Sequence, residues 1–332
     1  MSDIDVLENR LQSIAPQLLE LLLIDQTKTK HSGTPQRIFW ATSDYENLGP
    51  KFAYAEPITP ELITGKNGQV IRPRVLKDQG EQSNRSRIMA EVYTPAWLCN
   101  EQNNLVDREW FGRPNVFNFA EGTSWQSNPE PITFPQGKTW QDYVQAIRLE
   151  VTCGEAPYLV SRYDMTSGSY IPIQERVGLL DRKLRVVSEN TQSPEEWLKW
   201  AKIAFYSVYG FEWQGDSLLL ARENLLFTFG EFYQERWHEL PAITAVLAIA
   251  EIISWNLWQM DGLRGVIPNS CENKITYDNT LFGLETYEEL CPGCQREELL
   301  NSEHNGTYCL IKDWTKQERG TLGKIVRFVD LF

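Results

Sequence analysis

The sequence predicts an α/β fold in which helices connect the strands of a parallel sheet. Between residues 148 and 262, strand-like and helix-like patterns alternate in the order strand, helix, strand, helix, strand. Two of these strands end in the turn-forming pairs Cys153-Gly154 and Asp261-Gly262. The chain of 332 residues, 42 % hydrophobic and 12 % aromatic, is long and apolar enough to bury a sizeable core.

The N-terminal part of the chain is predicted to be helical and then irregular. Apolar residues recur every three or four positions from residue 4 to residue 24, and Pro16 within that pattern predicts the start of a second short helix. Residues 28–87 are turn-rich, and their basic segment 66–87 is either a solvated loop or a phosphate-contacting arm. We assign residues 1–90 to this N-terminal region and 91–332 to the core. The bases of the segment are Lys66, Arg72, Arg74, Lys77, Arg85 and Arg87.

The core begins after a long irregular connection, residues 111–140, that is rich in Pro, Gly, Asn and aromatic residues. Its clearest helix starts at Ser193, a suitable N-cap that is followed by Pro194 and by Glu196 as a capping-box partner. Gly210 is expected to end that helix. The other predicted elements are helix 141–147, strand 148–152, strand 211–213, helix 216–237, a helix from 241 and strand 255–260.

Charge and composition limit the possible partners and compartment. Acidic residues outnumber basic ones, 45 to 32, for a net charge of −13, whereas proteins that bind nucleic acid are usually basic. DNA binding would therefore need a local basic patch or a basic partner. The most apolar run, residues 242–258, is interrupted by polar side chains, so no membrane partner is expected. An N-terminus without a signal-peptide pattern and only six cysteines predict a cytoplasmic protein.

The segment from Arg148 to Leu159, RLEVTCGEAPYL, carries a likeness to a known family. It resembles the first motif of S-adenosylmethionine-dependent DNA methyltransferases of the adenine-modifying class, in which a strand ends in a tight glycine turn beside the cofactor. The family normally has a second glycine where this chain has Ala156. The resemblance implies a Rossmann-like methyltransferase sheet and a cofactor loop that contains Glu150, Cys153, Gly154, Glu155 and Ala156.

Three further matches follow the family's order. Tyr93-Thr94-Pro95 resembles the motif that lies beside the cofactor, and Tyr209-Gly210-Phe211-Glu212 resembles the second motif. Gln259-Met260-Asp261-Gly262 resembles the third. The resemblance implies that Glu212 binds the ribose hydroxyls and that Asp261 contacts the adenine amino group. The strings CGEAPYLVSRYD and WNLWQMDGL also resemble a bacterial family labelled "restriction endonuclease subunit M".

The catalytic motif of this class, Asp/Asn/Ser-Pro-Pro-aromatic, is absent from the chain. Its polar residue accepts hydrogen bonds from the target amino group, and its aromatic ring stacks on the flipped base. In motif order only Asp313 and Trp314 are available as the acceptor and the ring, on an expected fourth strand from Thr307 to Trp314. The alternative is a polar strand end with a half-buried tryptophan.

A cysteine and histidine cluster near the C-terminus predicts a zinc site within an insertion at residues 271–310. Cys291, Cys294, His304 and Cys309 have the spacing C-x2-C-x9-H-x4-C, and four nitrogen and sulfur ligands suit tetrahedral zinc. Cys271 is an alternative to His304 as the fourth ligand. The competing interpretation is a pair of free thiols in a turn.

These features support three functional hypotheses. The first is an S-adenosylmethionine-binding, DNA-methyltransferase-like subunit of a bacterial restriction-modification or anti-phage system, which would act on adenine in double-stranded DNA. The second is a catalytically degenerate methyltransferase fold that serves as a binding or partner subunit, with another protein subunit supplying target recognition or nuclease activity. The third is a metal-dependent nuclease; its nearest candidate, Asp181-Arg182-Lys183, is expected to be a solvated turn.

Overall fold

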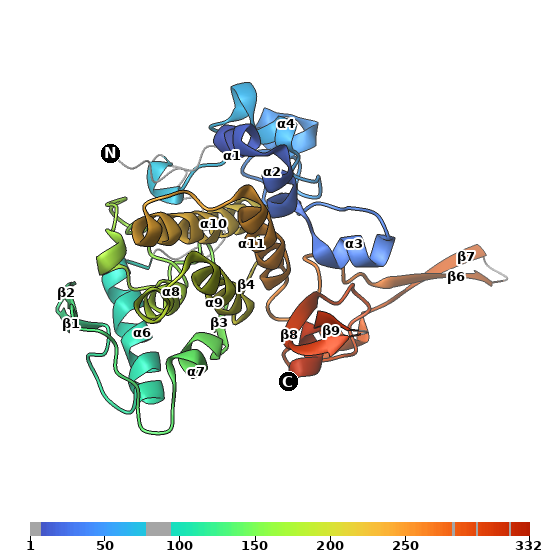
Figure 1. Cartoon of the computed structure of the whole chain (residues 1–332). Coiled ribbons are helices and arrows are strands. Elements are labelled where there is room, and N and C mark those ends of the chain that lie inside the picture. The colour runs from blue at the N-terminus through green and yellow to red at the C-terminus, as the bar shows by residue number, and fades with distance from the viewer. Residues whose placement is uncertain (1–7, 78–93, 281–282, 297, 319) are drawn as a thin grey trace.

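The computed structural model describes residues 8–77, 94–280, 283–296, 298–318 and 320–332. Figure 1 shows the arrangement of the elements. The helices are α1 (Glu8–Ile14), α2 (Pro16–Leu23), α3 (Gln26–Ser32), α4 (Pro60–Ile63), α6 (Ala96–Phe111), α7 (Trp140–Gln145), α8 (Leu179–Asn190), α9 (Pro194–Tyr206), α10 (Gly215–Trp237) and α11 (Ile243–Asn256). The strands are β1 (Asn118–Glu121), β2 (Ser124–Ser127), β3 (Arg148–Glu150), β4 (Val208–Glu212), β5 (Leu257–Gln259), β6 (Lys274–Thr280), β7 (Gly283–Glu289), β8 (Leu310–Glu318) and β9 (Thr321–Arg327).

A parallel sheet of three short strands lies in the centre of the chain, in the order β3-β4-β5. Leu149 is paired with Tyr209, and Phe211 is paired with Trp258. The connections between these strands are helical, since α8 and α9 precede β4 and α10 and α11 precede β5. A mixed α/β fold is thereby confirmed. The described residues form several small sheets, and the other three are two-stranded antiparallel pairs.

The N-terminal helices join the same core as the sheet. Pro16 occupies the first turn of α2, as the sequence predicts, and Leu18 and Leu22 of that helix are fully buried. Further along, the main chain of Phe39 exchanges two hydrogen bonds with the side-chain amide of Gln259 at the end of β5. These contacts hold the N-terminal region against the sheet.

The predicted start of α9 is confirmed, but its predicted end is wrong. The Ser193 hydroxyl accepts a hydrogen bond from the Glu196 main-chain N–H, whereas the Glu196 carboxylate accepts from the N–H of Gln192. The helix ends at Tyr206, and Gly210 lies inside β4. A Cβ atom at Gly210 would come within 3.3 Å of the Cys153 sulfur, so this glycine lets the loop after β3 approach β4 closely.

The solvated turn expected at Asp181-Arg182-Lys183 is instead a buried part of α8. Arg182 pairs with Asp107 of α6, and the Lys183 ammonium donates to the carbonyl of Val144. Burial lowers the pKa of Lys183 well below its ordinary value. The sequence pattern did not predict α8 as an amphipathic helix, because its buried face contains charged residues. These charges have partners only in the folded protein. These internal contacts occupy the residues that a nuclease centre would need.

Within the described residues, Lys66 of the basic segment is exposed and Arg72 is half-buried, whereas two other bases depart from both sequence interpretations. Arg74 and Lys77 are buried. The Lys77 ammonium lies 3.3 Å from the Asp216 carboxylate at the start of α10 and 3.2 Å from the Tyr45 hydroxyl. Arg85 and Arg87 lie outside the described residues. Arg74 and Lys77 thus belong to the interior of the protein, where they are unable to meet phosphate groups.

Two antiparallel hairpins complete the C-terminal part of the chain. In Figure 1, β6 and β7 extend away from the rest of the molecule, while β8 and β9 lie near α11. The β8–β9 pair contains an irregularity between Asp313 and Gln317. Within the described ranges, no helix has the length and apolar character that crossing a bilayer requires.

Candidate functional site

Three carboxylates follow the three parallel strands at their carboxyl ends. Glu150 ends β3, Glu212 ends β4, and Asp261 comes two residues after β5. The carboxyl edge of a parallel sheet is where ligands usually bind in α/β proteins. One hydrogen bond connects two of the strand ends, since the Glu212 carboxylate accepts from the Gly154 N–H at 2.8 Å. The structure therefore brings the residues of the first and second sequence motifs into contact.

The loop after β3 has an unusual backbone. Thr152, Gly154 and Ala156 all have positive φ, at 48°, 54° and 63°. Non-glycine residues with positive φ carry strain and occur often at functional sites. A Cβ atom placed on Gly154 would have no neighbour within 4 Å, so its backbone faces open space. A ligand can approach the main chain at this point.

Glu150 is buried, and its carboxylate accepts hydrogen bonds from the N–H groups of Tyr158 and Leu159. Burial raises the pKa of Glu150 to about 8, although those two hydrogen bonds act in the opposite direction. The nearby charge of Glu212 also raises this pKa. At neutral pH Glu150 is thus largely protonated, and it fixes the loop that follows β3.

Asp261 organises the turn after β5. Its carboxylate accepts hydrogen bonds from the Leu263 N–H and from the Arg264 guanidinium, at 3.0 and 3.1 Å. The Asp261 side chain is 5 % exposed, whereas that of Arg264 is 42 % exposed. The carboxylate therefore lies just beneath a basic group that faces solvent.

The other residues predicted to bind the cofactor lie in different places, some before α6 and some in the interior of the protein. Thr94 and Pro95 precede α6, and Asn103 of that helix donates to the Tyr158 carbonyl in the loop after β3. Cys153 is buried beside Gly210, and Glu155 accepts from the Arg74 N–H and the Tyr163 hydroxyl. Glu155 thus points into the protein rather than toward the carboxyl edge. Tyr93 lies outside the described residues.

Asp313 and Trp314 do not extend the parallel sheet. They lie on β8, which pairs with β9 in an antiparallel hairpin. The Trp314 ring is buried, stacks on Tyr206 at 4.4 Å between centroids and donates its Nε1–H to Asn256. Asp313 forms a 2.9 Å ion pair with Lys316. The expected fourth parallel strand is not formed by these residues, because hairpin pairing and tryptophan burial hold them elsewhere.

The metal-type cluster is formed by Cys271, Cys291, Cys294 and His304. Their three sulfur atoms and the His304 Nδ1 all lie within 4.8 Å of one another. Cys271 lies three residues before β6 and Cys291 two residues after β7, so the cluster joins the two ends of that hairpin. Three thiols and one imidazole nitrogen at these separations could bind a metal such as zinc.

Neighbouring groups orient the ligands and favour a cation. The Asn301 Nδ2 lies 3.3 Å from His304 Nε2, and Nδ1 of the same ring faces the three sulfurs. Gly293 lies so close to the His304 ring that a Cβ atom there would come within 2.6 Å of it. Burial and hydrogen bonds with Cys291 and Cys294 raise the pKa of Cys271 to about 12. The crowded sulfurs oppose joint ionisation, and a bound cation would relieve that repulsion.

Cys309, a predicted ligand, is outside the cluster. It is fully buried, and its thiol donates to the carbonyl of Gln259 at 3.3 Å. Cys271 takes its place beside His304, so both residues proposed for the fourth position are present together. The signal for Cys271 is the hairpin itself, since antiparallel pairing of β6 with β7 brings residues near its two ends together. That pairing depends on long-range contacts that cysteine spacing does not encode.

Comparison with protein-family models, with curated proteins and with solved structures finds no match for this chain. The functional interpretation therefore rests on the residues and the geometry described above.

Proposed function

We propose that this chain is an S-adenosylmethionine-binding, DNA-methyltransferase-like subunit of a bacterial restriction-modification or anti-phage defence system. The observation that carries the proposal is the hydrogen bond between Glu212, at the end of β4, and the Gly154 N–H in the positive-φ loop after β3. The proposed cofactor places its ribose hydroxyls near Glu212, its adenine near Asp261 and its methionine part along the main chain at Gly154. The open space at Gly154 suits this approach.

Calorimetric titration with S-adenosylmethionine tests the binding step. The wild-type chain is expected to bind, and Glu212→Gln and Asp261→Asn are expected to weaken binding by about tenfold or more, because each removes a charge-assisted hydrogen bond. Glu195→Gln, on the exposed first turn of α9, is the matched control and should leave the affinity unchanged. A wild-type chain that binds no cofactor at millimolar concentration contradicts the proposal.

A second, non-catalytic role is favoured by the strand pairing. Among the strands that the structure describes, β3 lies at an edge of the sheet, and β8 pairs with β9 instead of joining it. In a parallel ladder alternate residues face each neighbour, so the main chain of Leu149 is directed to the side away from β4. Ile147, Leu149 and Val151 are 56 %, 38 % and 61 % exposed, although parallel strands are normally covered. We therefore propose that another protein subunit pairs with β3 and completes the catalytic part.

Methyl transfer from labelled cofactor to double-stranded DNA separates the two roles. The lone chain is expected to show weak transfer or none, because the residues in motif order for catalysis are buried or ion-paired in the β8–β9 hairpin. Robust transfer by the lone chain that is lost in Asp313→Ala would establish an enzyme. Transfer that survives Asp313→Ala would place the catalytic strand elsewhere.

We also propose zinc as the metal of the Cys271, Cys291, Cys294 and His304 cluster. Thiolate-rich tetrahedral sites without a position for water or substrate are typical of structural zinc. In this role the metal would join the two ends of the β6–β7 hairpin to the turn that contains Gly293, and it would take no part in chemistry.

A further inference from the structure

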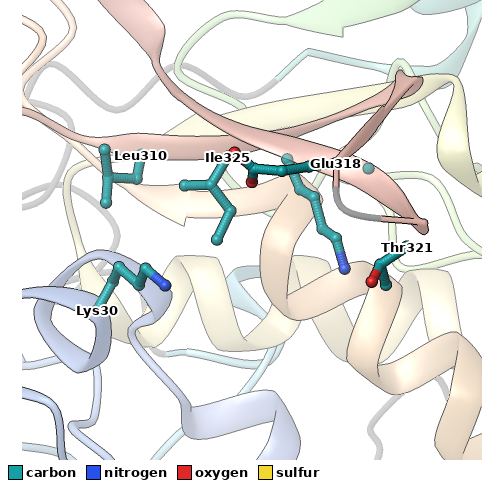
Figure 2. Close-up of a pocket in the computed structure, with 7 residues that line it drawn as sticks. Lys30, Leu310, Glu318, Thr321 and Ile325 are labelled. Carbon is teal, nitrogen blue, oxygen red and sulfur yellow. The ribbon is translucent and has the colours of Figure 1, made fainter.

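A cavity of about 500 Å³ lies between α3 and the β8–β9 hairpin. Figure 2 shows Lys30 entering it from α3, with Glu318 and Thr321 of the hairpin across from it. Leu310 and Ile325 form an apolar part of the wall. A second lysine, Lys312 of β8, also lines the cavity. Pockets that bind small ligands have volumes of about 300–1,000 Å³ and contain a few polar groups on an apolar wall.

Neither lysine of the cavity forms an ion pair within the described part of the chain, although the Glu318 carboxylate lines the same cavity. Two other cations of the hairpin are paired, Lys316 with Asp313 at 2.9 Å and Arg327 with Asp330 at 2.7 Å. The ammonium groups of Lys30 and Lys312 have no carboxylate within ion-pair distance among the described residues. Two unpaired cations facing one cavity stand out in a chain whose net charge is −13.

The position of Lys312 is fixed by the hairpin. Gly323 of β9 has a φ of +90°, and a Cβ atom there would lie 2.6 Å from Lys312 Cε and 2.8 Å from Cγ. The aliphatic stem of Lys312 therefore occupies the space that the missing side chain leaves. Its ammonium is 4.3 Å from the ring centroid of Trp314 and 5.8 Å from that of Trp255. Such cation–π contacts hold the charge in place before any ligand arrives.

From these observations we propose that the cavity binds the phosphate group of a phosphate ester. Lys30 and Lys312 provide two ammonium donors for the anionic oxygens, and the Thr321 hydroxyl provides a neutral donor. The Glu318 carboxylate accepts from a hydroxyl group of the ester, and its negative charge disfavours ligands that lack a donor. The phosphate comes either from a free sugar phosphate or from a nucleic-acid backbone. The site is separate from the proposed cofactor site, and neither depends on the other.

Calorimetric titration of the full chain tests the proposal, with inorganic phosphate and deoxyribose 5-phosphate as free probes and a short DNA duplex as the backbone probe. Lys30→Met and Lys312→Met keep an apolar stem but remove the charge, so each should weaken binding by about tenfold. Lys324→Met, an exposed lysine on β9 outside the cavity, is the matched control and should bind as the wild type does. Binding should also weaken as salt is added.

The outcomes separate the sources of the phosphate and the two proposals. Lysine-dependent binding of the free probes supports a sugar phosphate, and lysine-dependent binding of the duplex alone supports a nucleic-acid backbone. Glu212→Gln should retain phosphate binding, so failure of the cofactor site does not affect this result. The proposal is overturned if no probe binds when its phosphate groups are present at a concentration of tens of millimolar. It is also overturned if the wild type and both Met variants bind with equal affinity.

Discussion

At the scale of single residues, the protein buries several ionisable groups. Glu150, Asp181 and Lys183 are at most 6 % exposed, and each is held by hydrogen bonds from or to main-chain groups. The sequence gives the residue type of such groups, but their neighbours in the folded protein decide whether they are charged. For Glu150 the consequence can be measured as a dependence of stability on pH.

Glu150 should make the folded protein less stable as pH rises. Its pKa is about 8 in the folded chain, against an ordinary value of 4.5. Between these values the unfolded chain has lost the proton that the folded chain keeps, so the free energy of unfolding falls with rising pH and levels off above about 8. Glu150→Gln lacks this contribution. Denaturant unfolding of both proteins across this window gives the difference between them.

The direction in which this stability difference changes with pH shows whether Glu150 is protonated in the folded chain. The stability of the wild type relative to Glu150→Gln should decrease from the acid end of the window to the alkaline end. A constant penalty from the amide facing two N–H donors is allowed, because it does not vary with pH. A difference that stays flat or increases with pH would show that Glu150 is ionised in the folded chain.

The identity of the metal ligands is a second prediction at this scale. Cys271→Ser and Cys291→Ser should each lower the zinc content from about one ion per chain, since a tetrahedral site loses a thiolate. Cys309→Ser is the matched control, because that thiol is buried but bonded to the Gln259 carbonyl. Elemental analysis of the three purified variants makes the comparison. If Cys309→Ser loses as much zinc as the other two variants, Cys309 is a zinc ligand.

At the scale of elements, close approaches between segments explain several glycines. Gly215 begins α10, and a Cβ atom there would come within 2.0 Å of the Phe39 carbonyl. The Gly215 N–H donates to the carbonyl of Trp40. Gly215 therefore marks where the N-terminal region docks on α10. Gly230 lies in the same helix with nothing within 4 Å of its Cβ position.

The two glycines of α10 should respond in opposite ways to alanine. Gly215→Ala is expected to destabilise the protein by about 1–3 kcal/mol, since the added methyl group overlaps a main-chain carbonyl. Gly230→Ala should stabilise it by about 0.5–1 kcal/mol, because alanine loses less backbone entropy in a helix. Thermal unfolding of both variants measures these changes. If Gly215→Ala is neutral or stabilising, the N-terminal region does not dock on α10 as described.

At the scale of the whole molecule, one hydrophobic core extends from Leu11 to Phe328. It contains Leu22 and Trp40 from the N-terminal region, Phe205 and Phe229 from the helices around the sheet, and other buried side chains. Segments whose side chains share one core unfold together. In Figure 1 the β6–β7 hairpin extends away from the rest of the chain, and the metal-type cluster includes residues next to both of its ends.

Hydrogen exchange should divide the molecule accordingly. Peptides from α2 and β4 are expected to exchange with the same free energy of opening, because they belong to one cooperative core. Treatment with a chelator should speed exchange in residues 271–304 while leaving those peptides unchanged, since the ligands are confined to that segment. Faster exchange across the whole chain after chelation would show that the metal supports the core.

The sequence by itself determined the local features of the protein. The α/β alternation, the break at Pro16, the Ser193 cap and the thiols of the C-P-G-C turn follow from periodicity, capping and spacing, which depend on neighbouring residues. The motif order also indicated the strand ends that carry Glu212 and Asp261.

Only the tertiary structure decided which distant groups meet. The pairing of β6 with β7 places Cys271 in the metal-type cluster, where the sequence predicted Cys309. Folding also buries Lys77, Arg182 and Trp314. It also placed Lys30 and Lys312 at one cavity, although they lie far apart in the sequence. The physical reason is that burial of charge and pairing of strands gain or lose free energy through contacts across the whole chain, and local sequence patterns do not specify those contacts.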